Sequence, residues 1–254
     1  MTTPTLFPTI GFVAGATGYT GQAVVRELTG RGARAVAHVR PDSRTLAHWA
    51  ATFAADGAIT DTTPWDEAAI AATLARIRPT HVFALLGTTR ARGARGMSGA
   101  VADTYHAVDY GLTSLLVRAT RSAVPGARFI YLSSLGATEA GGNAYLTARA
   151  RVERELGESG LAYLVVRPSF ITGPDCTESR PAERISAAIA DTALTLAGWL
   201  GATTLRDRYS SITAADLARG MVRLALEPRA ERAVVDSADI RAEQRRISDV
   251  PATG

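Results

Sequence analysis

The sequence predicts an α/β fold in which helices cover both faces of a doubly wound, parallel sheet. Three observations lead to this prediction. Short apolar segments alternate along the chain with longer segments of helical periodicity. The apolar segments lack the strict polar–apolar alternation of a sheet with one wet face, so both faces should be buried. The connections between segments are short, and this order is typical of parallel strands joined by crossover helices.

The first half of the chain contains the clearest elements. An apolar stretch begins at Ile10 and runs into a glycine-rich turn, after which Val24, Val25 and Leu28 form the apolar side of a helix. Further strands are predicted over 34–39, 58–61 and 81–86, and a helix over 65–77. The helix ends at an Arg-Pro pair, because the residue before a proline disfavours the helical conformation.

The second half continues the same order and then becomes irregular. A long helix is predicted over 99–123, a strand over 129–134, a helix over 144–156 and a strand over 161–167. Beyond this point we expect helices near 187–200 and over 213–226, and a short strand around 233–236. We therefore predict a single domain over 1–254, in which 168–254 forms a small extension on the substrate side of the cleft.

The glycine turn has the pattern G-x-x-G-x-x-G, with Gly15, Gly18 and Gly21. Such glycines allow a tight turn, let backbone N–H groups approach a phosphate and let the helix pack close to the sheet. A glycine run alone can be an ordinary turn, and this spacing differs from G-x-G-x-x-G. Because it opens a βαβ unit, it favours a dinucleotide with its pyrophosphate at the positive end of the helix.

The end of the second strand indicates which dinucleotide is bound. Folds that prefer NAD place Asp or Glu about 20 residues after the glycine run, where the carboxylate binds the ribose 2′-hydroxyl. This chain has Arg40, followed by Pro41. A guanidinium suits a 2′-phosphate, so the sequence favours NADP (NADPH) over NAD; the alternative is a solvated arginine at a strand end.

Composition excludes several classes of protein. No apolar run is long enough to span a membrane, and the first residues lack the plan of a signal peptide. The single cysteine, Cys176, excludes an internal disulfide and fits a reducing cytoplasm. The four histidines have no metal-ligand spacing, so no metal site is expected.

The basic residues are unusual because all 28 are arginines, which excludes any mechanism that needs a lysine. They are spread along the chain without a nucleic-acid motif, so no nucleic-acid partner is expected. The one local cluster, over 90–96, is either a flap over an anionic cofactor or substrate or a solvated loop.

Three polar side chains lie at the end of the predicted strand over 129–134 or on the helix that follows it. Ser134 lies at its carboxyl end, where open α/β sheets bind ligands. Tyr145 and Arg149 are four residues apart and share one face of the next helix. A serine can fix a carbonyl oxygen and a tyrosine can give it a proton, while a nearby cation favours ionisation of the tyrosine. Each residue alone is commonplace, so the prediction depends on their order and spacing.

With these motifs the chain resembles the atypical short-chain dehydrogenase/reductases, closest to the bacterial relatives of the HIV Tat-interacting-protein-like, NAD(P)H-binding oxidoreductases. The resemblance covers nearly the whole chain and thins after about residue 190. The shared motifs are the glycine turn, Leu86-Gly87-Thr88-Thr89-Arg90, Val108-Asp109-Tyr110, Ser133-Ser134, Tyr145-Leu146, Arg167-Pro168 and, among the most specific, Glu178-Ser179-Arg180-Pro181.

The resemblance implies a Rossmann fold and a set of cofactor contacts. Thr17, Gly18, Tyr19 and Thr20 would wrap the pyrophosphate, and Arg40 would bind the 2′-phosphate. On the nicotinamide side, the resemblance implies a lining of Leu86 and Gly87. It also implies that Ile171 and Arg180 close over the cofactor. The family's Tyr-x-x-x-Lys reads Tyr145-Leu146-Thr147-Ala148-Arg149 here. Arginine can still bind the nicotinamide ribose, but it is bulkier and forked, so cofactor binding tolerates this change better than catalysis does.

The sequence therefore predicts an NADPH-dependent oxidoreductase that acts on a carbonyl or activated alkene of a small molecule, as a monomer or homodimer. The main alternative is an NADP(H)-binding sensor or regulator without turnover. A nucleotide-sugar epimerase or dehydratase would share the tyrosine, but the part of the chain after the last predicted parallel strand is short for a nucleotide-sugar domain.

Overall fold

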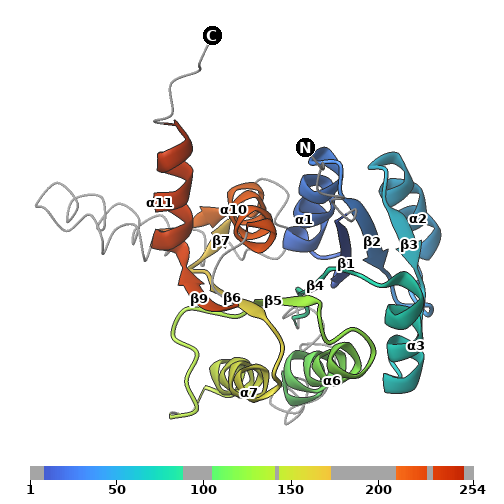
Figure 1. Ribbon diagram of the computed structural model, residues 1–254. Coiled ribbons are helices and arrows are strands. Elements are labelled where there is room, and N and C mark those ends of the chain that lie inside the picture. The colour runs from blue at the N-terminus through green and yellow to red at the C-terminus, as the bar shows by residue number, and fades with distance from the viewer. Residues whose placement is uncertain (1–8, 88–104, 141–142, 173–209, 228–230, 249–254) are drawn as a thin grey trace, which may run out of the picture.

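A sheet of seven parallel strands forms the centre of the molecule (Figure 1). The computed structural model describes residues 9–87, 105–140, 143–172, 210–227 and 231–248. The strands lie in the spatial order β3-β2-β1-β4-β5-β6-β9. Their bounds are β1 (Ile10–Ala14), β2 (Arg34–His38), β3 (Ile59–Asp61), β4 (His81–Ala84), β5 (Arg128–Leu132), β6 (Tyr163–Arg167) and β9 (Arg232–Asp236). The predicted parallel sheet is confirmed.

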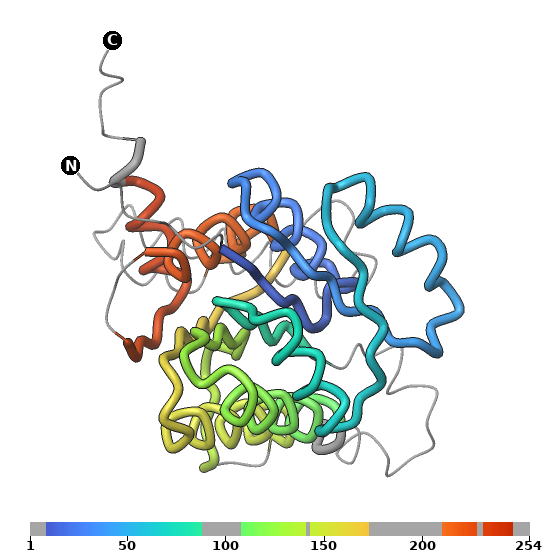
Figure 2. Tube along the Cα trace, turned by 45° about the vertical axis from the view of Figure 1, so that its right-hand side comes forward, coloured from blue at the N-terminus to red at the C-terminus, as the bar shows by residue number. Residues whose placement is uncertain are grey.

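Helices cover this sheet in two layers. They are α1 (Tyr19–Gly30), α2 (Leu46–Ala55), α3 (Glu67–Ile77), α6 (Thr113–Ala123), α7 (Ala144–Glu158), α10 (Ala214–Leu226) and α11 (Ser237–Ser248), with a π-helical segment, η1 (Tyr105–Leu112), before α6. Helices α1, α10 and α11 lie on one face, whereas α3, α6 and α7 lie on the other (Figure 1). Figure 2 shows α6 and α7 side by side in a second view.

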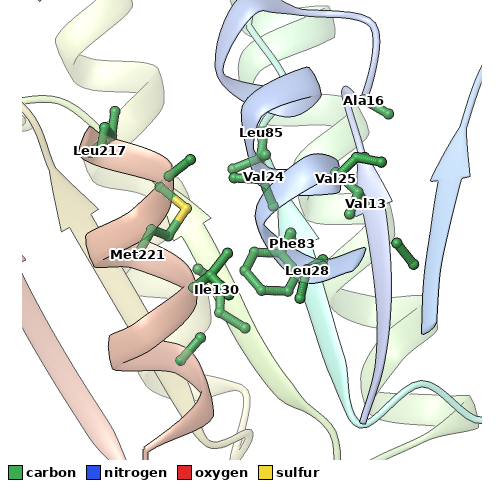
Figure 3. Close-up of a cluster of buried hydrophobic side chains, with 14 of the residues drawn as sticks. Val13, Ala16, Val24, Val25, Leu28, Phe83, Leu85, Ile130, Leu217 and Met221 are labelled. Atoms are coloured by element: carbon green, nitrogen blue, oxygen red, sulfur yellow. The ribbon is translucent and has the colours of Figure 1, made fainter. Parts of the chain in front are cut away.

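The two layers bury two separate apolar cores because neighbouring residues of a strand face opposite sides of the sheet. In β1, Val13 belongs to the core under α1 and α10, whereas Phe12 and Ala14 belong to the core under α3, α6 and α7. Both cores are apolar, which explains why the strands read as continuous apolar runs. Figure 3 shows part of the first core, where the labelled side chains include Val24, Leu28, Phe83, Ile130 and Met221.

The strand order reverses between β1 and β4, which makes this the topological switch point of the sheet. The chain moves outward from β1 through β2 to β3, and then crosses back to β4 on the other side of β1. Open parallel sheets bind ligands at such a switch point, outside the carboxyl ends of the strands. Because every neighbouring pair is parallel, the residues that follow β1, β2, β4, β5 and β6 all emerge at this same edge.

Several predicted boundaries differ from the structure by a few residues. The predicted strand over 129–134 ends at Leu132, and the predicted helix over 99–123 is a π-helical segment followed by α6 in its described part. Hydrophobic periodicity marks apolar faces, but hydrogen bonds decide where an element ends. The prediction of a helix near 187–200 lies outside the described residues.

Two helices and a small sheet were not predicted from the sequence. The stripe Leu46, Trp49 and Phe53 packs α2 onto the first core, and its spacing is that of a helix. Helix α11 is mostly polar and buries Ile240, so its periodic signal is weak. Strands β7 (Ile171–Thr172) and β8 (Ile212–Thr213) pair in parallel, although they are too short to recognise from sequence.

Candidate functional site

The glycine turn lies at the switch point, in direct contact with the end of β4. Gly15 has φ +84°, and a Cβ at this position would lie 2.5 Å from the carbonyl oxygen of Leu85. A Cβ at Gly18 would lie 3.3 Å from the carbonyl oxygen of Gly15. Glycine at these positions therefore brings the turn against β4, beside the predicted nicotinamide-side residues Leu86 and Gly87.

Helix α1 begins at this switch point. Its N-cap is Gly18, and no side chain caps the helix. The first N–H groups of a helix have no acceptor inside the helix, and with the helix dipole they form an anion site. Thr17 and Tyr19 are half-buried beside this end, and Thr20 and Gly21 are buried in the first turn. Gly18 itself is exposed, and its N–H donates to the carbonyl oxygen of Gly15 at 3.0 Å. A dinucleotide pyrophosphate fits the positive end of the helix beside it.

Arg40 follows β2, one strand away from the glycine turn. Its guanidinium is about half exposed, and Nη1 lies 3.4 Å from Oδ2 of Asp42. Strand β2 ends at buried His38, and Val39 after it is buried too, so Arg40 is the first charged residue beyond the strand. This position and charge are what the predicted contact with a 2′-phosphate needs.

A pocket of about 640 Å³ lies beyond the ends of β5 and β6. It is lined by Ser134, Leu135, Gly136, Tyr145, Pro168, Ser169, Phe170 and Ile171. The pocket thus brings together Ser134, Tyr145 and Ile171, which lie on three separate segments of the chain. A hydrogen bond from the N–H of Leu135 to the carbonyl oxygen of Pro168, 2.9 Å long, links two of its walls.

The start of α7 fixes the backbone of Tyr145. Asn143 is the N-cap, and its Oδ1 accepts hydrogen bonds from the N–H groups of Tyr145 at 3.0 Å and Leu146 at 3.2 Å. Asparagine is among the preferred residues at this position because its side chain satisfies N–H groups that the helix cannot. The tyrosine therefore stands on the first turn of a capped helix rather than on a loop.

Arg149 lies under Tyr145, in a buried ion pair. Its Nη2 donates to Oδ1 of Asp109 at 2.8 Å, and its Nη1 donates to the carbonyl oxygen of Leu132 at 2.7 Å. The guanidinium carbon is 5.0 Å from the ring centroid of Tyr145 and 5.7 Å from that of Tyr131. Arg149 thus joins η1, the end of β5 and the tyrosine, and it is not among the residues that line the pocket.

The surroundings of Arg149 keep the guanidinium charged. Burial acts to lower the pKa of Arg149, but Tyr131, Tyr145 and Asp109 raise it, and the net pKa lies above the ordinary value. Burial also raises the pKa of Tyr131 to about 12, so this phenol stays neutral. The positive charge beneath Tyr145 is therefore permanent at every pH at which the fold is stable.

A second polar cluster holds α7 against the sheet. Glu153 of α7 accepts hydrogen bonds from Ser133, which follows β5, and from Arg167 at the end of β6. The Arg167 Nε contacts to Glu153 are 3.0 and 3.2 Å long, and hydrogen bonding to Glu153 raises the pKa of Arg167. The cluster ties the helix that carries Tyr145 to two strand ends.

The two hydroxyl residues of the pocket were predicted from the sequence, but the residues that hold their surroundings in place were not. Asp109, Glu153 and Asn143 were not assigned these roles, although an asparagine before a helical segment is a recognisable N-cap signal. Arg180 and the cluster over 90–96 lie outside the described residues. Within the described part of the chain, no group of acidic, histidine or cysteine side chains could hold a metal, and no helix is both long and apolar enough to cross a membrane.

The fold and the glycine turn define a protein of the dinucleotide-binding α/β class. The chain belongs to the NAD(P)H-binding family, whose model matches residues 15–228. This agrees with the resemblance to atypical short-chain dehydrogenase/reductases. A comparison with curated proteins gives no match.

Solved structures with the same fold include oxidoreductases and epimerases. A short-chain dehydrogenase/reductase from Serratia marcescens aligns at 15% identity over 91% of this chain and 97% of that one, with a TM-score of 0.62. The UDP-glucuronic acid 4-epimerase of Bacillus cereus, in complex with UDP-glucuronic acid and NAD, aligns at 14% identity over 90% and 77% of the two chains, with a TM-score of 0.62. The Bordetella bronchiseptica enzyme WbmH, in complex with NAD+, aligns at 17% identity over 89% and 75%, with a TM-score of 0.57.

Proposed function

We propose that this protein is an NADPH-dependent oxidoreductase that reduces a carbonyl group or an activated alkene of a small molecule. The proposal rests on the observation that two features lie at one edge of the sheet. The uncapped N-terminus of α1 and the pocket with Ser134 and Tyr145 both open there. Phosphate binding and proton donation are thus available on the same side of one rigid sheet.

The cofactor would be held by groups that flank the switch point. Thr17, Gly18, Tyr19 and Thr20, at the N-terminus of α1, would wrap the pyrophosphate, and Arg40 would bind the 2′-phosphate. Leu86 and Gly87, just after β4, would line the nicotinamide side, and Ile171, which lines the pocket, would close over the cofactor. The cofactor, when bound, supplies a hydride.

The pocket hydroxyls would handle the substrate oxygen. Ser134 would fix it by a hydrogen bond, and Tyr145 would donate the proton, because both line the same pocket. Arg149 would act through Tyr145, since its guanidinium lies under the ring and is bound to Asp109 and Leu132.

The same arginine favours a second candidate function, an NADP(H)-binding sensor without turnover. The guanidinium is buried, donates to Asp109, Leu132 and Tyr131, and does not line the pocket, so a contact with a nicotinamide ribose in the pocket would require the side chain to move. A protein in this state could bind the dinucleotide through α1 and Arg40 and signal its redox state to a partner.

The two functions are separated by measuring turnover and binding in the same variants. NADPH oxidation is followed with a broad panel of aldehydes, ketones and quinones, and NADPH affinity is measured by fluorescence titration. For the oxidoreductase, Tyr145→Phe should lower turnover by about 10²–10⁴ and keep NADPH affinity within a few-fold. Tyr163→Phe, on β6 outside the pocket lining, is the matched control. Substantial turnover that persists in Tyr145→Phe contradicts the tyrosine mechanism, and a silent panel with tight NADPH binding favours the sensor.

A further inference from the structure

The pocket beside Tyr145 has few polar groups of its own. Among the described residues that line it, three carry hydroxyls and none carries a charge. Ser169 is already bound, because its Oγ donates to the carbonyl oxygen of Ser210 at 2.5 Å and lies 3.1 Å from Oγ of Ser237. Ser134 has a weak contact, 3.4 Å, with the carbonyl oxygen of Leu135. The lining therefore suits one small polar group, at Ser134 and Tyr145.

Two of the described cations near this end of the sheet are paired with carboxylates, whereas Arg241 donates to the carbonyl oxygens of Ser210 and Ser211. Arg149 is paired with Asp109, and Arg167 is paired with Glu153. An anionic substrate entering this part of the pocket would lose hydration without gaining an ion pair from the described lining. The described part of the lining therefore favours a neutral substrate group over a carboxylate, a phosphate or a nucleotide sugar.

Phe170 gives the pocket an apolar wall that faces solvent. Phe170 has 61% of its surface exposed, the largest exposed fraction among the exposed large apolar residues of the described chain. The backbone around it is fixed on both sides. The N–H of Ile212 donates to the carbonyl oxygen of Phe170 at 2.8 Å, and the N–H of Ser169 donates to Oγ of Ser237 at 3.0 Å. Its exposure is thus imposed by the fold, and an apolar ligand could cover it.

We infer that the pocket selects a neutral, apolar carbonyl compound, such as an aromatic aldehyde or ketone without a carboxylate, phosphate or sugar group. Its carbonyl oxygen lies between the hydroxyls of Ser134 and Tyr145, and its apolar body covers Phe170. The volume of about 640 Å³ is ample for a molecule of this size. This inference rests on the proposed function, because it names the substrate class of the same site.

The test compares two aldehydes whose para substituents have a similar size and differ in charge: 4-isopropylbenzaldehyde and 4-carboxybenzaldehyde. With NADPH and the full-length protein, kcat/KM should favour the neutral aldehyde at least tenfold. Phe170→Ala should lower kcat/KM for the neutral aldehyde about tenfold and change that for the charged one much less. Phe170→Arg should reverse the preference. Ile59→Ala, an exposed apolar residue on the edge strand β3, is the matched control and should change neither value.

Ligand-observed NMR with the two corresponding benzyl alcohols, in the presence of NADP, separates failure of this inference from failure of the proposed function. Selective binding of the neutral alcohol that is lost in Phe170→Ala, without turnover of any aldehyde, supports the pocket assignment and overturns the oxidoreductase. Reduction of both aldehydes with equal kcat/KM overturns the pocket assignment and leaves the oxidoreductase standing. Equal binding of both alcohols, or binding of neither, also overturns the assignment.

Discussion

A Cβ on Gly87 would lie 2.9 Å from Nη2 of Arg149. The same nitrogen donates to Asp109 at 2.8 Å, so the guanidinium cannot move away without stretching that bond. Gly87 belongs to the predicted nicotinamide side of the cleft, and Arg149 occupies the position of the family's lysine. The two residues are therefore a matched pair, since the arginine needs the space that glycine leaves.

This pairing predicts that Gly87→Ala is costly with arginine at position 149 and cheaper with lysine. The added methyl group overpacks the buried guanidinium, which should lower the free energy of unfolding by about 1–3 kcal/mol. In the Arg149→Lys background the guanidinium is absent, so Gly87→Ala should lower the free energy of unfolding by about 1 kcal/mol less. Urea denaturation of the four proteins measures this coupling. Gly126→Ala is the control, because a Cβ there meets nothing within 4 Å. Equal costs in both backgrounds would show that the two residues are independent.

The ion pair between Asp109 and Arg149 predicts strong non-additivity. Asp109→Leu or Arg149→Met alone leaves one buried charge without its partner, and each should lower the free energy of unfolding by about 3–5 kcal/mol. The double variant replaces both charges with apolar groups, so it should be more stable than either single variant. The exposed pair between Arg154 and Glu139 provides the control, since Glu139→Gln should change stability by less than about 1 kcal/mol. Additive effects at 109 and 149 would contradict the proposed ion pair.

The burial of His38 and His81 leads to a prediction of how the free energy of unfolding depends on pH. Burial lowers the pKa of His38 from its ordinary value of 6.5, although the hydrogen bond to the carbonyl oxygen of Thr63 acts in the opposite direction. The unfolded chain therefore binds the proton first as the pH falls. The free energy of unfolding should decrease as the pH falls below about 6.5 and level off below the lowered pKa of the folded state. His81 contributes in the same direction, since burial lowers its pKa too.

Urea denaturation between pH 5 and pH 7 measures this dependence. Each histidine can contribute a slope of at most about 1.4 kcal/mol per pH unit. His38→Gln removes one titrating group and should reduce the slope, whereas His48→Gln, on the exposed side of α2, is the control and should leave it unchanged. A slope that is the same in His38→Gln as in the wild type would mean that His38 does not contribute.

The sheet could be predicted from the sequence because its signals are local. Each central strand is a short apolar run, and the glycine turn fixes where the first strand meets its helix. The same locality placed Ser134 at a strand end and Tyr145 on a helix. Their convergence on one pocket follows from the parallel order of β5 and β6, which the sequence pattern also predicts.

The surroundings of Arg149 could not be predicted, because they depend on contacts between distant segments. Asp109 is 40 residues away along the chain, on a π-helical segment whose hydrogen bonding has no periodic signature. From the sequence, Gly87 looks like an ordinary loop glycine, because only the structure shows that the guanidinium of Arg149 lies beside it. Arg149 also keeps a buried Nε for which the described part of the chain offers no acceptor, so arginine fits this position imperfectly.

The last prediction concerns cofactor preference, which depends on Arg40. The protein should bind NADPH more tightly than NADH by about ten- to hundred-fold, because a charge-assisted contact with the 2′-phosphate contributes roughly 1.5–3 kcal/mol. Arg40→Ala should remove most of this preference by weakening NADPH binding and should leave NADH binding within a few-fold. Arg121→Ala, an exposed arginine on α6, is the control for the loss of one positive charge and should keep the preference. Fluorescence titration of both dinucleotides measures these affinities, and raising the salt concentration should reduce the preference because the contact is partly exposed. Equal affinities in the wild type, or an unchanged preference in Arg40→Ala, would assign the 2′-phosphate to other residues.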